Sequence, residues 1–310
     1  MPEQENPGQR PILAAGHGVV SKAALRKRSD VGLNIRSAVT VSLVPEAKGG
    51  PFVFWDDLPA AIDQTASLGF DALEVFAPGP DAIPAETLGQ SLKSRGLALA
   101  AVGTGAGWVK HKLLLTDADA GQRKRAVEFV RSMIDFGAAA GSITGTPAPA
   151  IIGSMQGRWA GDVTKEMALG WLREALDELG AHAASRGAML LIEPLNRFET
   201  NLVNTLADGS ALLRSLKSTN VKLLADLFHM NIEEQDPATA LLAAGADVGH
   251  LHFVDSNRRP AGCGHIDYGP VASALRRIGY GGFASAETLP WPDPVAAAKQ
   301  TIEVYRRVFA

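Results

Sequence analysis

The chain alternates short apolar runs with longer segments of helical periodicity, from about residue 35 to its end. There are eight such pairs, and the apolar runs are rich in Val, Ile, Leu and Ala. This alternation is typical of βα units whose strands form a parallel sheet. The predicted strands are residues 37–44, 71–76, 97–103, 148–154, 188–194, 221–226, 248–254 and 282–287.

The segments between these strands carry residues that begin and end helices. Several start with Pro, Asp or Thr, which suit a first helical turn, and several stop at Gly. The predicted helices are residues 57–69, 84–96, 119–141, 164–187, 205–218, 236–245, 268–279 and 292–309.

The number and length of the units favour a closed barrel. Eight units in about 276 residues fit a (β/α)8 TIM barrel, whose usual size is roughly 250 residues. A doubly wound sheet is the alternative, but no predicted strand is followed by a G-x-G-x-x-G turn. The nearest segment, "GTGAGW" at 103–108, lacks the third glycine and is interpreted as a flexible loop. We predict an α/β fold, a single-domain TIM barrel over residues 35–310, after a loosely ordered N-terminal extension over residues 1–34.

Composition excludes several classes of protein. At 310 residues with 46% apolar content, the chain can bury a large core. A formal net charge of −3, from 30 basic and 33 acidic residues, gives no positive field for a nucleic acid backbone. The single Cys263 cannot form an intrachain disulfide, and no stretch approaches the roughly 20 apolar residues of a membrane span. Because the N-terminus also lacks the cationic start of a secretory signal, we expect a cytoplasmic protein that binds neither nucleic acid nor a membrane.

Metal-binding side chains stand near the ends of the last four predicted strands, which carry Glu193, Asp226, His252 and Glu287 in that order. In a TIM barrel the loops after the strands gather at one end, so these side chains should converge on one mouth. A single acid at a strand end is commonly a helix cap or an ion-pair partner, but that explanation does not account for four in consecutive units. Three carboxylates around one point need a cation, because like charges in a partly buried site otherwise cost several kcal/mol or force protonation.

The ligand types indicate the kind of ion and the kind of chemistry. An oxygen-rich set with one imidazole and no thiolate suits Mn²⁺, Mg²⁺ or Co²⁺ better than structural zinc. We predict one divalent cation, with Mn²⁺ as first choice and Co²⁺ or Mg²⁺ as alternatives. Such an ion stabilises the charge that develops on a sugar oxygen when the neighbouring carbon loses a proton. Two glutamates on opposite sides of the ion can remove a proton from one face of that carbon and return one to the other.

Four segments around these residues resemble one family of enzymes. They are "IEPLNRFET", "ADLFHMNIEE", "HLHFVDSNRRPAGCGHIDY" and "SAET", all between residues 192 and 288. Together they resemble the xylose-isomerase-like sugar isomerase/epimerase superfamily and, within it, the D-tagatose 3-epimerase and D-allulose (psicose) 3-epimerase family. The resemblance extends from about residue 35 to the end. Spacings of 33, 26 and 35 residues between the four candidate ligands agree with that family's metal site.

The resemblance implies a role for each candidate ligand. Glu193 and Glu287 would be metal ligands and also the catalytic acid/base pair. Asp226 and His252 would complete the metal site. The implied reaction is C3 epimerisation of a ketose through a metal-stabilised enediolate.

The resemblance also implies substrate contacts. Glu199, His229 and Arg258 fall on positions that in the family hold the O1, carbonyl and hydroxyl oxygens of the sugar. We assign His252 rather than His250 as the ligand, because only His252 keeps the family's six-residue step to Arg258. The expected partner is a small sugar, and self-association as a dimer or tetramer stays open.

Other residues near the predicted mouth have less specific interpretations. Glu74 shares the strand-end location and is expected to be structural, and His250 is expected to be a hydrogen-bonded histidine behind the site. Trp108 and Trp159 follow the third and fourth strands, where they can cover a sugar or pack a loop.

The sequence departs from the family in the loop at 45–57, which carries Phe52, Phe54 and Trp55. We expect this loop to lie over the mouth and to shape a larger or less polar pocket. Hydroxypyruvate isomerases, inosose dehydratases and enzymes of keto-glycosides share the same metal framework. An aldose–ketose isomerase of hydroxypyruvate type, or a lyase or dehydratase acting on inososes or keto-glycosides, is therefore the alternative.

Two further classes fit the residues poorly. Abasic-site endonucleases share the barrel but use additional histidines from earlier strands, and no His occurs between residues 18 and 110. A binding module without catalysis would have lost the acid/base pair, whereas both glutamates are present.

Overall fold

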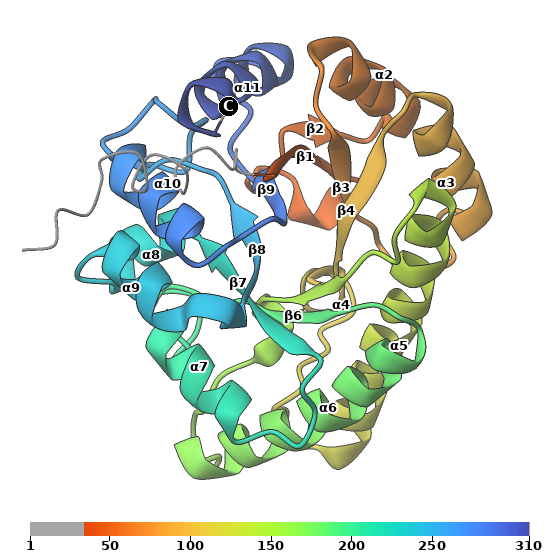
Figure 1. Ribbon diagram of the computed structural model, residues 1–310. Helices are drawn as coiled ribbons and strands as arrows, with labels where there is room; N and C mark the ends of the chain where they lie inside the picture. Colours follow the sequence, from red (N-terminus) through yellow and green to blue (C-terminus); the bar gives the residue numbers. More distant parts are fainter. Residues whose placement is uncertain (1–33, 310) are drawn as a thin grey trace, which may run out of the picture. The chain divides into compact units, whose positions relative to one another are not determined.

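The computed structural model describes residues 34–309. These residues form a closed barrel of parallel strands surrounded by helices (Figure 1). Residues 1–33 of the predicted N-terminal extension lie outside the described residues. The strands pair in the order β2-β1-β3-β4-β5-β6-β7-β8-β9, and an additional pairing of β1 with β9 closes the barrel. The predicted TIM barrel is confirmed.

Eight of the strands are the predicted ones, with ends that agree within two residues. The ninth, β2, was not predicted; it pairs with the end of β1, beyond the point where the pairing of β1 with β9 stops. The strands are β1 Arg36–Ser42, β2 Phe54–Trp55, β3 Ala72–Phe76, β4 Ala98–Gly103, β5 Ala150–Ile152, β6 Leu190–Ile192, β7 Val221–Asp226, β8 Val248–His252 and β9 Phe283–Ala286.

The eight predicted helices are also present. Side chains at their starts, such as Asp57, Asp119 and Thr164, accept backbone N–H groups of the first turn. They are α2 Leu58–Leu68, α3 Ala85–Ser94, α5 Ala120–Thr144, α6 Lys165–Ser185, α7 Leu206–Arg214, α9 Pro237–Ala244, α10 Tyr268–Arg277 and α11 Pro294–Phe309. Two short helices, α4 Ala106–Val109 and α8 Leu227–Glu233, were not predicted, nor were the 3-10 turns η1 Pro45–Ala47, η2 Ser154–Gln156 and η3 Gly245–Asp247.

Two local predictions were wrong. The helix predicted to reach residue 218 ends at Arg214, because the Asp177 carboxylate of α6 accepts the N–H groups of Lys217 and Ser218 at 2.7 and 3.0 Å. The segment 103–108, interpreted as a flexible loop, is not a loop throughout, because residues 106–108 belong to α4. Its glycines serve packing, since a Cβ on Gly107 would lie 2.2 Å from the sulfur of Met155.

The inside of the barrel is filled in layers. Near the strand starts lie Ala38, Ala72, Ala100 and Phe283, and above them lie Ala101, Ile151, Leu191 and Leu224. Because side chains alternate along a strand, the residues two positions after Leu191 and Leu224 share the inward face. Those residues are Glu193 and Asp226, so the interior changes from apolar to acidic where the strands end.

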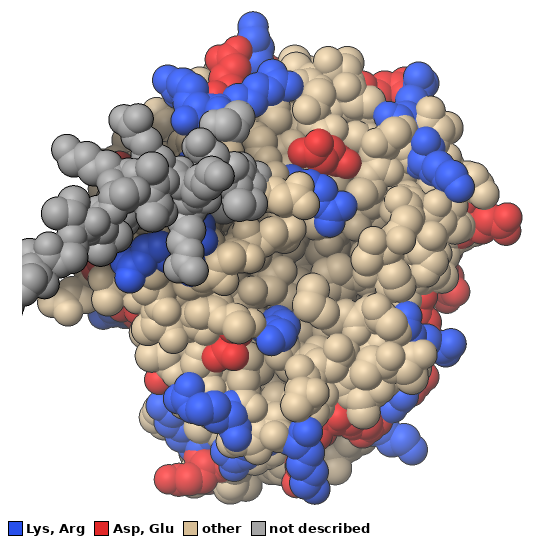
Figure 2. Space-filling view, in the orientation of Figure 1, with Lys and Arg blue, Asp and Glu red and all other residues tan. Residues whose placement is uncertain are grey.

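The face of the described barrel in Figure 2 carries charges of both signs. Lysines and arginines are interspersed with acids on the face in Figure 2, and the basic residues form no continuous patch on that part of the chain. Over residues 34–309, no helix is long and apolar enough to cross a membrane.

Candidate metal centre and active site

A cavity of about 480 Å³ opens at the carboxyl ends of the strands. Six of the seven predicted site residues line it: Glu193, Glu199, His229, His252, Arg258 and Glu287. The seventh, Asp226, lies just behind them and is 1% exposed. The structure therefore brings all the predicted site residues to one place, and their roles stay predictions.

The four candidate metal ligands form one tight group. Glu193, Asp226, His252 and Glu287 each offer one oxygen or nitrogen atom, and these four atoms lie within 4.8 Å of one another. They come from the ends of β6, β7, β8 and β9, four neighbouring strands of the barrel.

The two carboxylate oxygens of Asp226 have different contacts, one with the start of α8 and one with the other site residues. Its Oδ1 accepts the N–H groups of Phe228 and His229 at 2.8 and 3.1 Å and so caps α8. This leaves Oδ2 facing the group, where it lies 3.0 Å from His252 Nδ1 and accepts from Arg258 Nη1 at 2.6 Å. Burial by itself would raise the pKa of Asp226, but Arg258, His229 and His252 hold it below its usual value. Asp226 is thus a fixed, ionised carboxylate.

Glu193 is the least satisfied acid in the group. Its Oε1 is buried and has no hydrogen-bond partner, since His252 Nδ1 is 3.5 Å away. Burial raises its pKa; His252 opposes this effect, and the charges on Glu287 and Asp226 add to it. Space for the carboxylate comes from Gly153, where a Cβ would lie 2.7 Å from Glu193 Oε2.

These residues fit a divalent cation. Three carboxylates and one imidazole nitrogen meet at a point, and one buried carboxylate oxygen has no partner. A cation there would supply the missing partner and offset the repulsion among the acids. The donor set of oxygens with one nitrogen suits Mn²⁺, Co²⁺ or Mg²⁺.

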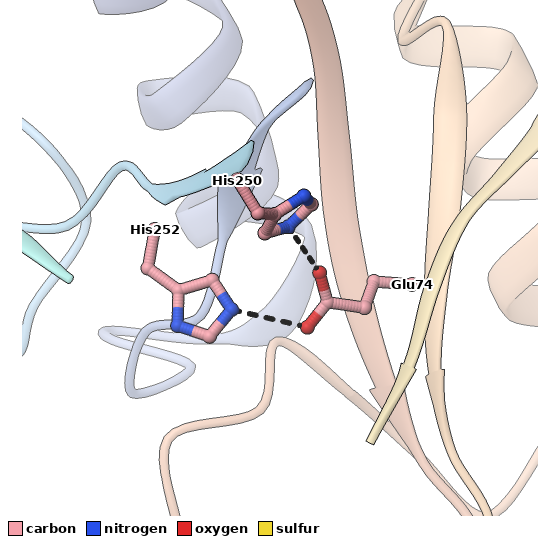
Figure 3. A group of neighbouring side chains, drawn as sticks. All are labelled: Glu74, His250 and His252. Atoms are coloured by element: carbon pink, nitrogen blue, oxygen red, sulfur yellow. Dashed lines mark hydrogen bonds and ion pairs between the residues drawn. The ribbon is translucent and has the colours of Figure 1, made fainter. Parts of the chain in front are cut away.

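Glu74 of β3 approaches the group from the opposite wall of the barrel (Figure 3). Its Oε1 is 3.2 Å from His252 Nε2 and its Oε2 is 2.9 Å from His250 Nε2. Burial by itself would raise the pKa of Glu74, but the two histidines hold it well below its usual value. Glu74, His250 and His252 are also close enough to hold an ion. This second group does not need one, because both carboxylate oxygens already accept a hydrogen bond.

Arg258 covers the acids from the loop after β8. Its guanidinium donates to Asp226 Oδ2 and to Glu287 Oε2, and its side chain is 12% exposed. The guanidinium also lies 4.8 Å from the ring centre of Phe228. The backbone of Arg258 has φ of 61°, an uncommon value for a residue other than glycine.

His229 presents a defined nitrogen to the cavity. Asn196 donates to its Nδ1 at 2.8 Å, and the orientation of the Asn196 amide is fixed because its Oδ1 accepts from the N–H of Phe198 at 3.0 Å. The proton of neutral His229 must therefore lie on Nε2, which is 3.8 Å from Glu193 Oε1. Asn196 also donates to Glu199 Oε1 at 2.8 Å, so it positions both predicted substrate contacts.

The opposite wall of the cavity is largely apolar. Phe52 stacks on Phe76 at 4.6 Å between ring centres, and both line the cavity with Trp108. The expectation for the loop at 45–57 was wrong in part, because Phe54 packs in the core and does not line the cavity. Trp159 is also absent from the lining; its ring N–H donates to the carbonyl of Asn201 at 3.0 Å.

Sequence reasoning missed the roles of Glu74 and Asn196. Asn196 stands inside the quoted "IEPLNRFET" segment, but nothing in the sequence shows that its amide bonds His229, 33 residues away. Glu74 is 178 residues from His252, and only the closure of the barrel brings the two together.

Comparisons with known proteins show which family the chain is similar to. A model of the xylose isomerase-like TIM barrel family matches residues 62–308. The D-psicose 3-epimerase of Agrobacterium fabrum is 34% identical over 268 residues, which cover 84% of this chain and 85% of that protein. The D-psicose 3-epimerase of Ruminiclostridium cellulolyticum is 30% identical, over 83% of this chain and 88% of that protein. The crystal structure of D-allulose 3-epimerase from Methylomonas sp. in complex with D-allulose shares the fold, with a TM-score of 0.74 at 23% identity over 89% of this chain and 97% of that one.

Proposed function

Because this chain belongs to the xylose isomerase-like TIM barrel family, we propose that it is a divalent-metal-dependent sugar epimerase that inverts C3 of a ketose. The observation that carries the proposal is the group of Glu193, Asp226, His252 and Glu287 at the cavity, in which two glutamates share one small space. The D-psicose 3-epimerases among its relatives support the choice of reaction.

The four residues of this group would hold the ion, with Mn²⁺ expected and Co²⁺ or Mg²⁺ as alternatives. When bound, the ion supplies Lewis-acid stabilisation of negative charge on substrate oxygens. The ligand atoms would be one oxygen each from Glu193, Asp226 and Glu287, and Nδ1 of His252.

Glu193 and Glu287 would move the proton. They approach the group from β6 and β9, so one can take a proton from one face of C3 while the other returns a proton to the opposite face. Burial raises the pKa of Glu193 toward neutral pH, which suits a group that must both accept and donate a proton.

Other side chains would hold the sugar and its developing charge. His229 carries its proton on Nε2, toward the cavity, and can donate to a substrate oxygen. Arg258 provides a second, permanently charged donor above Asp226 and Glu287. Glu199, held by Asn196, would accept from a sugar hydroxyl.

The test is removal and return of the metal with a panel of ketoses. We expect thorough chelation to abolish epimerisation of D-psicose, D-fructose, D-tagatose or L-ribulose. Mn²⁺ or Co²⁺ should restore it better than Ca²⁺, whose larger coordination shell suits more ligands. Full activity of rigorously metal-free protein would refute the metal site. An aldose product, or elimination of water or an aglycone, would favour the isomerase or lyase alternative that shares the same first proton removal.

A further inference from the structure

Glu74 stands between two histidines of β8 and touches no other candidate ligand in the described contacts. Figure 3 shows its carboxylate facing both imidazoles, with one oxygen toward each. The distances are 3.2 Å to His252 Nε2 and 2.9 Å to His250 Nε2. Glu74 is 4% exposed and both histidines are 1% exposed, so no solvent competes for these bonds.

The chemistry of these contacts determines which nitrogen of His252 is available. A carboxylate only accepts hydrogen bonds, so His252 must carry a proton on Nε2 to bond Glu74. In a neutral imidazole that leaves the lone pair on Nδ1. Nδ1 is the atom that faces the acids, 3.0 Å from Asp226 Oδ2, 3.4 Å from Glu287 Oε2 and 3.5 Å from Glu193 Oε1.

We propose that Glu74 is a positioning residue of the metal centre, which fixes the ring of His252 and the tautomer that presents Nδ1 to the ion. The inference rests on the proposed metal site. Glu74 then increases the affinity for the ion by holding His252, which is a more specific role than the structural one expected from the sequence.

His250 secures the other side of this arrangement. By donating to Oε2 it occupies the second carboxylate oxygen and limits rotation of Glu74. Two β-bulges lie beside the contact between Glu74 and His250. In the pairing of β3 with β4, Ala100 has no partner residue, and in the pairing of β7 with β8, Gly249 has no partner residue. Such bulges re-aim neighbouring side chains, here at Glu74 and at His250.

The first experiment measures Mn²⁺ binding to the full-length chain by calorimetry after metal removal. Glu74→Gln keeps the size of the side chain, but its amide can donate to His252 and so favour the wrong tautomer. We expect its Kd for Mn²⁺ to rise about 10–100-fold, as is typical when the partner of a metal-binding histidine is lost. The matched control is Glu303→Gln, the same substitution on the exposed face of α11, which should leave the Kd unchanged.

A second measurement does not depend on any variant being folded. Protein labelled with ¹⁵N-histidine and loaded with diamagnetic Mg²⁺ should show His252 with its proton on Nε2 and none on Nδ1. A proton on Nδ1 of His252 in this sample would overturn the inference, as would an unchanged Kd in folded Glu74→Gln. If the unchanged chain bound no divalent ion, the proposed metal site would be refuted, and the role of Glu74 would be refuted with it. Normal binding by the unchanged chain, with no effect of Glu74→Gln, would overturn the inference alone.

Discussion

The acids at the barrel mouth have different hydrogen-bond partners, which fits the different functions proposed for them. One oxygen of Asp226 caps α8, and the other accepts from Arg258 and faces His252 Nδ1. Glu193 has a buried oxygen without a partner, and Glu287 contacts Arg258. The pKa of Asp226 is lowered and that of Glu193 is raised, so their environments favour opposite protonation states. In the proposed site, Asp226 is therefore suited to hold the ion and Glu193 is suited to accept and return a proton.

At the scale of single residues, we predict that substitutions of Glu287 and Arg258 affect different quantities. Glu287→Gln should lower kcat about 10²–10⁴-fold, the usual effect of losing a positioned acid or base. Glu303→Gln, on the exposed face of α11, is the matched control and should leave kcat unchanged. Steady-state kinetics with a ketose and Mn²⁺ measure both.

Arg258→Ala should keep one Mn²⁺ per chain, because the four candidate metal ligands are unchanged. It should bind and turn over the sugar poorly, because the guanidinium that donates to the sugar is lost. Metal analysis of the purified variant tests this half of the prediction. Loss of bound metal from Arg258→Ala, together with normal turnover by Glu287→Gln, would reverse the assigned roles.

At the scale of elements, the loop after β8 determines where Arg258 lies. The buried Asp255 binds three backbone N–H groups of this loop: Ser256 at 2.8 Å, Gly262 at 2.8 Å and Ile266 at 3.2 Å. The carbonyl of Asp255 also accepts the N–H of Arg258 at 3.0 Å. These bonds stabilise the left-handed backbone of Arg258, which costs roughly 1–2 kcal/mol for a residue with a side chain.

Asp255→Asn should loosen this loop, because an amide nitrogen cannot accept a backbone N–H. We expect a loss of about 1–3 kcal/mol in the free energy of unfolding, measured with urea, and a higher KM for the sugar. Burial by itself would raise the pKa of Asp255, but the backbone hydrogen bonds hold it below its usual value. A lowered carboxyl pKa stabilises the fold above the unfolded value of about 4 and loses that effect as pH falls through the folded value. The stability difference between the chain and the variant should therefore narrow in acid, and equal stabilities at pH 7 would contradict this account of the loop.

Elements with a repeated pattern could be predicted from the sequence, and those without one could not. The barrel strands are apolar on both faces, as buried parallel strands are, and most of the longer helices have capped ends. By contrast, β2, α4 and α8 are too short to show a repeating pattern of apolar residues, and α8 begins directly after the site residue Asp226. The four candidate metal ligands could be predicted from the sequence because they stand at the ends of consecutive predicted strands. Glu74 was not assigned a function because its partners lie on the far side of a closed barrel.

At the scale of the whole molecule, the barrel holds the cavity between two unlike walls. The ends of β6 to β9 supply the acids, the histidine and, from the following loops, Glu199 and Arg258. The aromatic rings of Phe52 after β1, Phe76 at the end of β3 and Trp108 after β4 give the other wall a large apolar surface. Polar chemistry at one wall and an apolar surface opposite suit a sugar that is held at its reacting end and covered along its chain.

The central claim is that one glutamate removes the proton at C3 of a ketose and the other returns a proton to the opposite face of C3. Incubation of the Mn²⁺-loaded protein with D-psicose or another accepted ketose in D₂O, followed by NMR, locates the exchanged position. The account predicts deuterium at C3 while the C3 epimer accumulates, because the proton returned to C3 comes from a group in exchange with solvent. Deuterium confined to C1 or C2 with an aldehyde product, or loss of water or an aglycone without a C3 epimer, would contradict it.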